Sequence, residues 1–153
     1  MRRFAAAAAL CAVVAACGDD PFGPHDFRDL QQAEARWAEN GLRDYSFQIR
    51  RTCFCPPEYN EWATVQVRDG AVVSVSVGDT LDMTADRIEE WPVVEALFET
   101  IRATASGDWV EALDVEYDGA LGYPVNIRAR AEEGLLDASL TIETRHLNPL
   151  PAP

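Results

Sequence analysis

Apolar residues recur with two different periods along this chain, and the order of the periods indicates its fold. They return every three or four positions over residues 27–40 and again over 92–105, which predicts two amphipathic helices, the second with Pro92 in its first turn. Strict alternation predicts strands in five further segments, residues 45–55, 62–79, 111–118, 123–131 and 136–147. The second of these segments is a hairpin around an Asp69-Gly70 turn, so six strands are expected in all.

The predicted order is therefore helix, three strands, helix, three strands. This order favours an α+β domain in which two αβββ halves form one antiparallel sheet with helices packed on one face. In the hairpin, alternation places three residues of each strand on the core side, namely Ala63, Val65 and Val67 opposite Val73, Val75 and Val77. A length of 153 residues and a hydrophobic content of 48% suit one domain with its own core. The acidic connector over 78–91 is not assigned to an element.

The first seventeen residues have the layout of an export signal. Two arginines precede an apolar run over residues 4–14, and the segment "VAAC" that ends at Cys17 resembles the lipobox of bacterial lipoproteins. Cleavage by an ordinary secretory peptidase, without lipidation, is the alternative. No other stretch is long and apolar enough for a membrane span. The expected division is a signal peptide over 1–16, a lipidated N-terminus and flexible tether over 17–26, and a single α+β domain over 27–150.

This layout predicts an exported protein that its lipid anchors to the cell envelope, in the outer membrane facing the periplasm if the host has two membranes. Without residues 1–16 the chain has 11 arginines, no lysine and 26 acidic residues, a net charge of −15. Such an acidic domain is not expected to bind nucleic acid. It is also not expected to touch the membrane except through the N-terminal lipid.

Export and lipidation would leave Cys53 and Cys55 as the remaining cysteines, because Cys11 lies in the signal peptide and Cys17 carries the lipid. Disulfides persist in the oxidising compartments outside the cytoplasm, so a bridge is the first expectation. Residues two apart in a strand have Cα atoms about 6.6 Å apart, near the upper limit for a disulfide, so a bend is required. Three interpretations stay open: a local structural disulfide, a redox-active pair, and reduced or metal-bound thiols.

The motifs of the common catalytic families are missing. The sequence contains no G-x-S-x-G, H-E-x-x-H, phosphate-binding loop or dinucleotide fingerprint. His146 is interpreted as structural, with its side chain on the core side of the last strand. The carboxylates of Asp114, Glu116 and Asp118 share a strand face, as in some calcium sites, but an exposed ladder with Arg128 and Arg130 explains them better. We therefore expect no enzyme, no metal and no cofactor.

Several segments together resemble one family. The lipobox, "YSFQIRRTCFCP", "VRDGAVVSV", "ALFETI" and "EYDGALGYPVNI" are similar to the exported bacterial family called domain of unknown function 6174, from about Trp37 to Ile142. The resemblance implies an exported, often lipid-anchored domain, and it implies no activity.

The function expected from these observations is a non-catalytic binding or assembly module for an envelope protein or peptide. Its candidate binding residues are aromatic, glycine and proline residues of two loops: Phe54, Tyr59, Gly122, Tyr123 and Pro124. The alternative is a thiol-disulfide or metal-handling envelope protein that uses Cys53 and Cys55.

Overall fold

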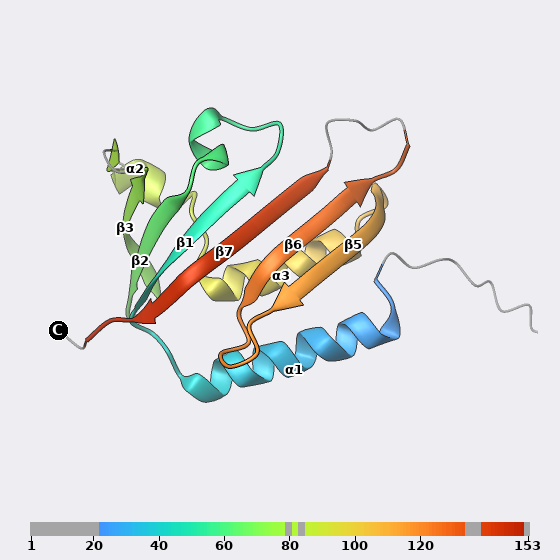
Figure 1. The fold of residues 1–153 in the computed structure, drawn as a ribbon, viewed down its shortest axis with the longest axis horizontal. Coiled ribbons are helices and arrows are strands. Elements are labelled where there is room, and N and C mark those ends of the chain that lie inside the picture. Colours follow the sequence, from blue (N-terminus) through green and yellow to red (C-terminus); the bar gives the residue numbers. More distant parts are fainter. Residues whose placement is uncertain (1–21, 79–80, 83–84, 134–138, 152–153) are drawn as a thin grey trace, which may run out of the picture.

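Seven strands form one antiparallel sheet in the computed structural model, which describes residues 22–78, 81–82, 85–133 and 139–151 (Figure 1). The helical elements are α1 (Pro24–Asn40), η1 (Pro57–Asn60), α2 (Ala85–Ile88) and α3 (Val94–Ala105). The strands are β1 (Tyr45–Thr52), β2 (Ala63–Arg68), β3 (Ala71–Val77), β4 (Leu81–Asp82), β5 (Val110–Tyr117), β6 (Pro124–Ala131) and β7 (Leu140–Pro149). Their order across the sheet is β4-β3-β2-β1-β7-β6-β5. The predicted signal peptide and Cys17 lie outside the described residues.

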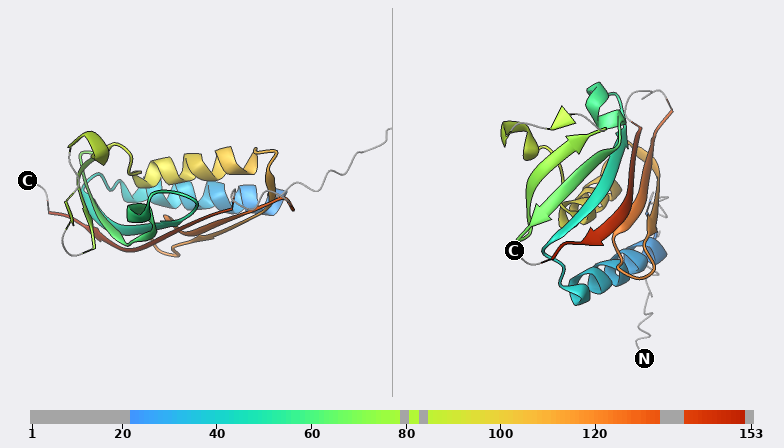
Figure 2. Two further views of the ribbon diagram at one scale, coloured as in Figure 1. Left: turned by 90° about the horizontal axis from the view of Figure 1, so that it is seen from above. Right: turned by 60° about the vertical axis from the view of Figure 1, so that its left-hand side comes forward.

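The predicted α+β architecture is confirmed. Each of the long helices α1 and α3 is followed by three consecutive antiparallel strands, and both helices lie on the same face of the sheet (Figure 2). The two halves meet where β1 pairs with β7, in a ladder that runs from Tyr45 opposite Pro149 to Thr52 opposite Thr141. This ladder joins the first strand of the chain to the last. Among the described residues, no helix is long and apolar enough to cross a membrane.

Helix α1 begins three residues earlier than the apolar period predicted. Gly23 caps it through a bond from its backbone N–H to the Asp26 carboxylate (2.8 Å), and Pro24 supplies a first residue that needs no hydrogen-bond partner. Phe22 is buried and meets the Phe27 ring edge-on at 4.9 Å. The prediction of a flexible tether up to residue 26 is therefore wrong for residues 22–26, because Phe22 packs into the domain. The predicted end of the helix is right, since Gly41 stops it in the left-handed conformation.

The sheet corrects the predicted hairpin at one residue. Ala63 pairs with Val77 and Val65 with Val75, as the alternation predicts, but Val67 pairs with Val72. A β-bulge makes Val73 an additional residue whose side chain is 48% exposed. Elsewhere the boundaries move: the strand predicted over 45–55 ends at Thr52, and the helix predicted from Pro92 begins at Val94. The unassigned connector contains β4 and α2.

A hydrogen-bonded group between the buried Trp37 and Tyr45 and the exposed Glu95 links both helices to β1. The Trp37 indole N–H donates to the Glu95 carboxylate at 2.8 Å, and the Tyr45 hydroxyl donates to its other oxygen at 3.4 Å. The same hydroxyl accepts a bond from the Val94 backbone N–H at 3.1 Å, which satisfies the first turn of α3. Burial raises the pKa of Tyr45 above its usual value. Residues 37, 45 and 94–95 are thus fixed together although they are distant in sequence.

The β5–β6 turn packs against α1 more closely than a side chain would allow. Gly122 has φ +85°, and a Cβ atom there would lie 2.3 Å from the Ala33 carbonyl oxygen. Asp118 shapes the turn by accepting bonds from the N–H groups of Ala120 and Leu121. Glycine at position 122 is therefore required both by its backbone conformation and by the neighbouring helix.

Replacement Gly122→Ala should lower the free energy of unfolding by at least about 1–3 kcal/mol, the cost of a left-handed backbone in a non-glycine residue. The contact with Ala33 adds to that cost. Gly119→Ala in the same turn is the matched control, because a Cβ there meets nothing within 4 Å. Urea unfolding followed by circular dichroism measures both variants, and equal destabilisation would contradict the packing described.

Candidate functional site

Two consecutive arginines at the end of β1 point to opposite faces of the sheet. Arg50 lies on the face without helices, where it bonds the Glu143 carboxylate at 2.5 Å and stacks over Trp62. Arg51 continues the inward row of Tyr45, Phe47 and Ile49, so its side chain enters the helix-covered face. A guanidinium thus lies at a position that the strand pattern reserves for an apolar residue.

Arg51 lies against two aromatic rings. Its guanidinium carbon is 5.0 Å from the centre of the Tyr59 ring and 5.4 Å from that of Trp91, within the range of cation–π attraction. Its Nη2 donates to the Glu90 backbone oxygen at 2.9 Å. Burial lowers the pKa of Arg51. The guanidinium is held in place by stacking and by one hydrogen bond, and no ion pair joins it to a carboxylate in the part of the chain that the structure describes.

A polar group anchors the two aromatic rings. The Tyr59 hydroxyl donates to the Glu90 carboxylate, and Arg87 bonds Glu58 at 2.5 Å and lies 3.7 Å from Glu90. The hydrogen bond from Arg87 lowers the pKa of Glu58, while burial and the bond to Glu90 raise that of Tyr59. The Tyr59 and Trp91 rings lie 5.1 Å apart. This group fixes η1 to the segment that follows α2, and so fixes the rings around Arg51.

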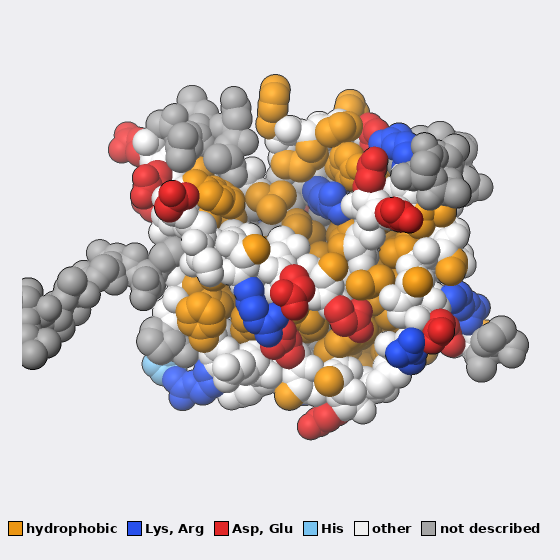
Figure 3. Space-filling model, turned by 180° about the vertical axis from the view of Figure 1, so that it is seen from behind, with side chains coloured by type: hydrophobic (Ala, Val, Ile, Leu, Met, Phe, Trp, Pro, Cys, Tyr) orange, Lys and Arg blue, Asp and Glu red, His pale blue; other side chains and the backbone are white. Residues whose placement is uncertain are grey.

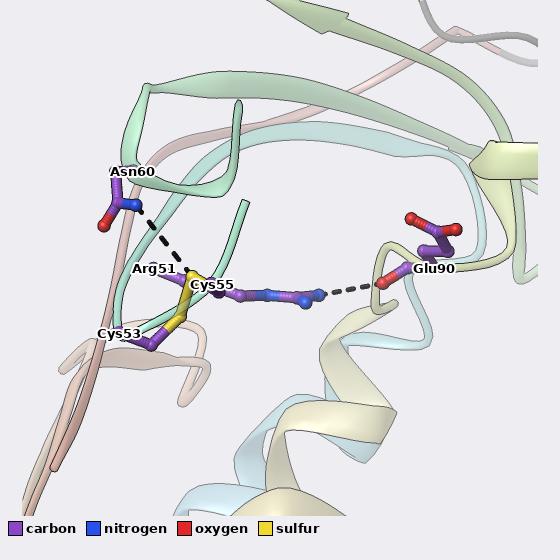
Figure 4. The surroundings of a disulfide bond; sticks show 5 residues. All are labelled: Arg51, Cys53, Cys55, Asn60 and Glu90. Carbon is purple, nitrogen blue, oxygen red and sulfur yellow. Dashed lines mark hydrogen bonds between the residues drawn. A yellow bond between two sulfur atoms is a disulfide. The ribbon is translucent and has the colours of Figure 1, made fainter. Parts of the chain in front are cut away.

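The cysteine pair lies directly beside Arg51. Cys53 and Cys55 form a disulfide with a Cα–Cα distance of 5.2 Å, in a bend that follows the end of β1 (Figure 4). The bend that the two-residue spacing required is therefore present. The Asn60 amide donates to the Cys55 sulfur at 3.9 Å. Both cysteines are half-buried, whereas Phe54 between them is 88% exposed.

Two cavities adjoin Arg51, its aromatic neighbours and the disulfide, and Pro92 lines both cavities. The first, which we call the disulfide cavity, has a volume of about 280 Å³ and is lined by Arg51, Cys53, Pro92, Leu97, Thr100, Leu140 and Ile142. The second, the Trp91 cavity, has about 560 Å³ and is lined by Ala71, Val72, Ile88, Glu89, Glu90, Trp91, Pro92, Val93 and Ala96. Figure 3 shows this face hollowed above the helices, with hydrophobic side chains around a basic one. The buried indole N–H of Trp91 has no hydrogen-bond partner among the described residues.

A third cavity between α1 and α3 differs in chemistry. It has a volume of about 330 Å³, and Glu34, Glu95 and Arg102 are among its lining residues. Arg102 forms an ion pair with Glu34, and Glu95 accepts the bonds from Trp37 and Tyr45. Because these charged groups satisfy each other or the core, they leave little for a ligand. The cavities beside Arg51 are the better candidates.

The predicted binding residues do not come together. Phe54 and Tyr59 lie in the segment after β1, Phe54 exposed and Tyr59 buried against Trp91. Gly122 and Tyr123 lie in the β5–β6 turn against α1 and Pro124 begins β6, at the opposite end of the sheet, and the side chains of Tyr123 and Pro124 are buried (Figure 1). The prediction missed Arg51 and Trp91. The signal for Arg51 was available in the sequence, since it interrupts the apolar side of an alternating strand.

The other predicted polar residues have local partners. Arg130 bonds Glu111 at 3.1 Å, Asp114 lies opposite Arg128, and Asp118 caps its own turn. No group of three or more histidine, cysteine or acidic residues suited to a metal occurs in the described ranges. His146 has φ +53° at a bulge of β7, so its side chain is exposed, near the Gln48 amide at 3.2 Å. The prediction that it faces the core is wrong, because the bulge reverses the alternation.

Comparison with known proteins identifies a family. No curated protein and no solved structure matches the chain. The model of a family of unknown function, DUF6174, matches residues 29–149, which include most of α1, all of α3, every strand that the structure describes and the cysteine pair. The chain therefore belongs to the DUF6174 family.

Proposed function

We propose that this protein is a lipid-anchored component of the cell envelope whose domain is a non-catalytic binding or assembly module. The layout of residues 1–17 supports the anchor, because charge, apolar run, small residues and cysteine follow in the order of a lipoprotein signal. In this proposal Cys17 carries the acyl chains and the protein is exported. In a host with two membranes it lies in the outer membrane and faces the periplasm.

The observation that carries the binding role is the position of Arg51. A guanidinium on the core side of a sheet costs free energy unless its charge is paired, and an aliphatic residue would pack there at lower cost. Arg51 contributes the charged group to an otherwise mostly apolar cavity. An apolar cavity with a few fixed polar groups is the usual form of a ligand site. Arg51 is thus better explained by recognition than by stability.

The same surroundings favour binding over catalysis. Nucleophilic and acid–base catalysis usually needs a histidine or a carboxylate within hydrogen-bond reach of a reactive group. His146 lies on the other face of the sheet, near Gln48, and His25 bonds Arg28 on α1. The Glu90 carboxylate is occupied by Tyr59. The proposed module therefore binds its partner without changing it.

Replacement Cys17→Ser should abolish acylation and move the protein from the membrane fraction to the soluble fraction of the envelope. The reason is that the lipid is the proposed membrane attachment. Incorporation of a radiolabelled fatty acid, followed by fractionation, measures both effects. Label that still enters the variant would remove the lipid anchor from the proposal.

A photoreactive amino acid in place of Phe54 should give a covalent adduct of discrete mass in intact cells. Phe54 is 88% exposed and lies between the two residues that form the disulfide. Phe27 on α1 is the matched control, because it is an exposed phenylalanine (43%) outside the proposed site. Mass spectrometry of the purified protein detects the adducts. Identical adduct patterns at both positions, or none at position 54, would contradict a binding role for this end of the sheet.

A second candidate function is thiol-disulfide exchange. Cys53 lines the same cavity as Arg51, and a nearby guanidinium favours the thiolate form of a cysteine. In such an exchange, one thiolate of a partner dithiol attacks one sulfur of the bridge and the other sulfur leaves as a thiolate, which gives a mixed disulfide. The second thiolate of the partner then attacks its own sulfur in that mixed disulfide, so that the partner becomes a disulfide and the pair leaves as two thiolates. Metal handling by the reduced pair is the remaining variant of this candidate.

Titration against glutathione separates these functions. A structural bridge should resist reduction, and replacing both cysteines by serine should cost no more than about 1–2 kcal/mol of unfolding free energy, because the closed loop has three residues. The binding function would persist in that variant. Ready exchange with glutathione would favour the redox candidate, and two thiols in protein taken directly from the envelope would favour metal handling.

A further inference from the structure

We propose that the disulfide cavity binds the terminal carboxylate of a peptide whose last residue is aliphatic. This inference rests on the proposed function and names the ligand class of the same site. It follows from three properties of the cavity: its charge, the size and polarity of its walls, and the chemistry of the adjoining Trp91 cavity.

The positive charge of Arg51 favours an anionic ligand. An arginine side chain has five N–H donors, and the described contacts of Arg51 use one of them, on the Glu90 backbone oxygen. The Tyr59 and Trp91 rings lie next to each other, 5.1 Å apart, and contact the guanidinium from one side, which leaves the N–H donors along its other edge for hydrogen bonds. A planar carboxylate matches that edge with two parallel bonds. Because the rings already hold the side chain still, binding would immobilise little further.

The residues that line the disulfide cavity favour a short aliphatic group. Leu97, Leu140 and Ile142 provide apolar surface, and the Thr100 hydroxyl is already bonded to the Ala96 carbonyl oxygen at 2.9 Å. The volume of about 280 Å³ lies just below the roughly 300–1,000 Å³ range of drug-sized ligand sites. The cavity therefore accommodates one side chain next to its carboxylate, rather than a large rigid ligand.

The neighbouring cavity favours a peptide over a fatty acid. Across Pro92, the Trp91 cavity is mostly apolar, but it is also lined by Glu89, whose exposed carboxylate is an acceptor. The N–H groups of a peptide, or a basic side chain upstream of its end, would find acceptors there. An acyl chain would contact the apolar walls and leave the Glu89 carboxylate and the Trp91 indole N–H without a hydrogen-bond partner. The occupant that satisfies both cavities is a peptide that ends at Arg51.

Fluorescence polarisation with the full mature protein in lipid nanodiscs tests this inference. The probes are three fluorescein-labelled tetrapeptides that end in Leu, Val or Ile, each with a C-terminal carboxylate or the corresponding amide. At least one carboxylate should bind tenfold or more tightly than its amide. Equal binding of every pair, or no binding of any peptide, would overturn the proposal.

Three variants locate the effect. Arg51→Gln should remove the preference for the carboxylate, whereas Arg50→Gln, next to it but on the other face, should retain it. Thr100→Leu fills the cavity while Arg51 stays in place, so it should weaken carboxylate binding at least tenfold without loss of the fold, which circular dichroism checks. A preference that survives Arg51→Gln, or that Arg50→Gln removes equally, would overturn the assignment to Arg51.

Decanoate as a competitor separates the peptide from a fatty acid. It should displace the bound peptide only at concentrations at least tenfold above those of the unlabelled peptide, and equal potency would overturn the peptide assignment. If these assays fail while the adduct at position 54 persists, the ligand class is wrong and the binding function stands. If both fail, the binding function is lost as well.

Discussion

The width of the sheet, set against the number of helices that cover it, determines most of this structure. Seven strands about 4.8 Å apart span about 29 Å, whereas two helices of about 10 Å diameter cover about 20 Å. Helix α3 contacts β5 and β6, and the short α2 contacts β3. Between α3 and α2, the segment around Trp91 and the disulfide bend cover the sheet. Cavities therefore form there, where irregular chain replaces a helix.

Much of the fold was predictable because local patterns determine it. The apolar stripe of α3 and the alternation of β1, β2 and β6 reflect burial on one side, and the structure buries that side in each, including Leu97, Phe47 and Ile127. The errors occur where one residue changes the register. A bulge at Val73 and another near His146 leave the sequence pattern intact but reverse which side chains face the core. The start of α1 was missed because its cap is a glycine.

The candidate site was less predictable, because tertiary contacts assemble it. Arg51 and Trp91 are 40 positions apart, and Trp91 belongs to an acidic connector with no clear period. The cysteine pair and Phe54 were recognised from spacing alone, and Tyr59 from its place in a loop. The alternation of β1 places Arg51 on the inward side, so its position could have been predicted. Its neighbour Arg50 points outward and pairs with Glu143. Its aromatic partners required the folded arrangement.

The position of β7 has a consequence for how the chain can be handled in the cell. The last strand, β7, lies inside the sheet between β1 and β6, so the two halves cannot join until almost the whole chain is available. Until β7 is available, the N-terminal half leaves the edge of β1 without its neighbour. In the exported protein proposed above, this strand order delays completion of the core until nearly the end of the chain is available.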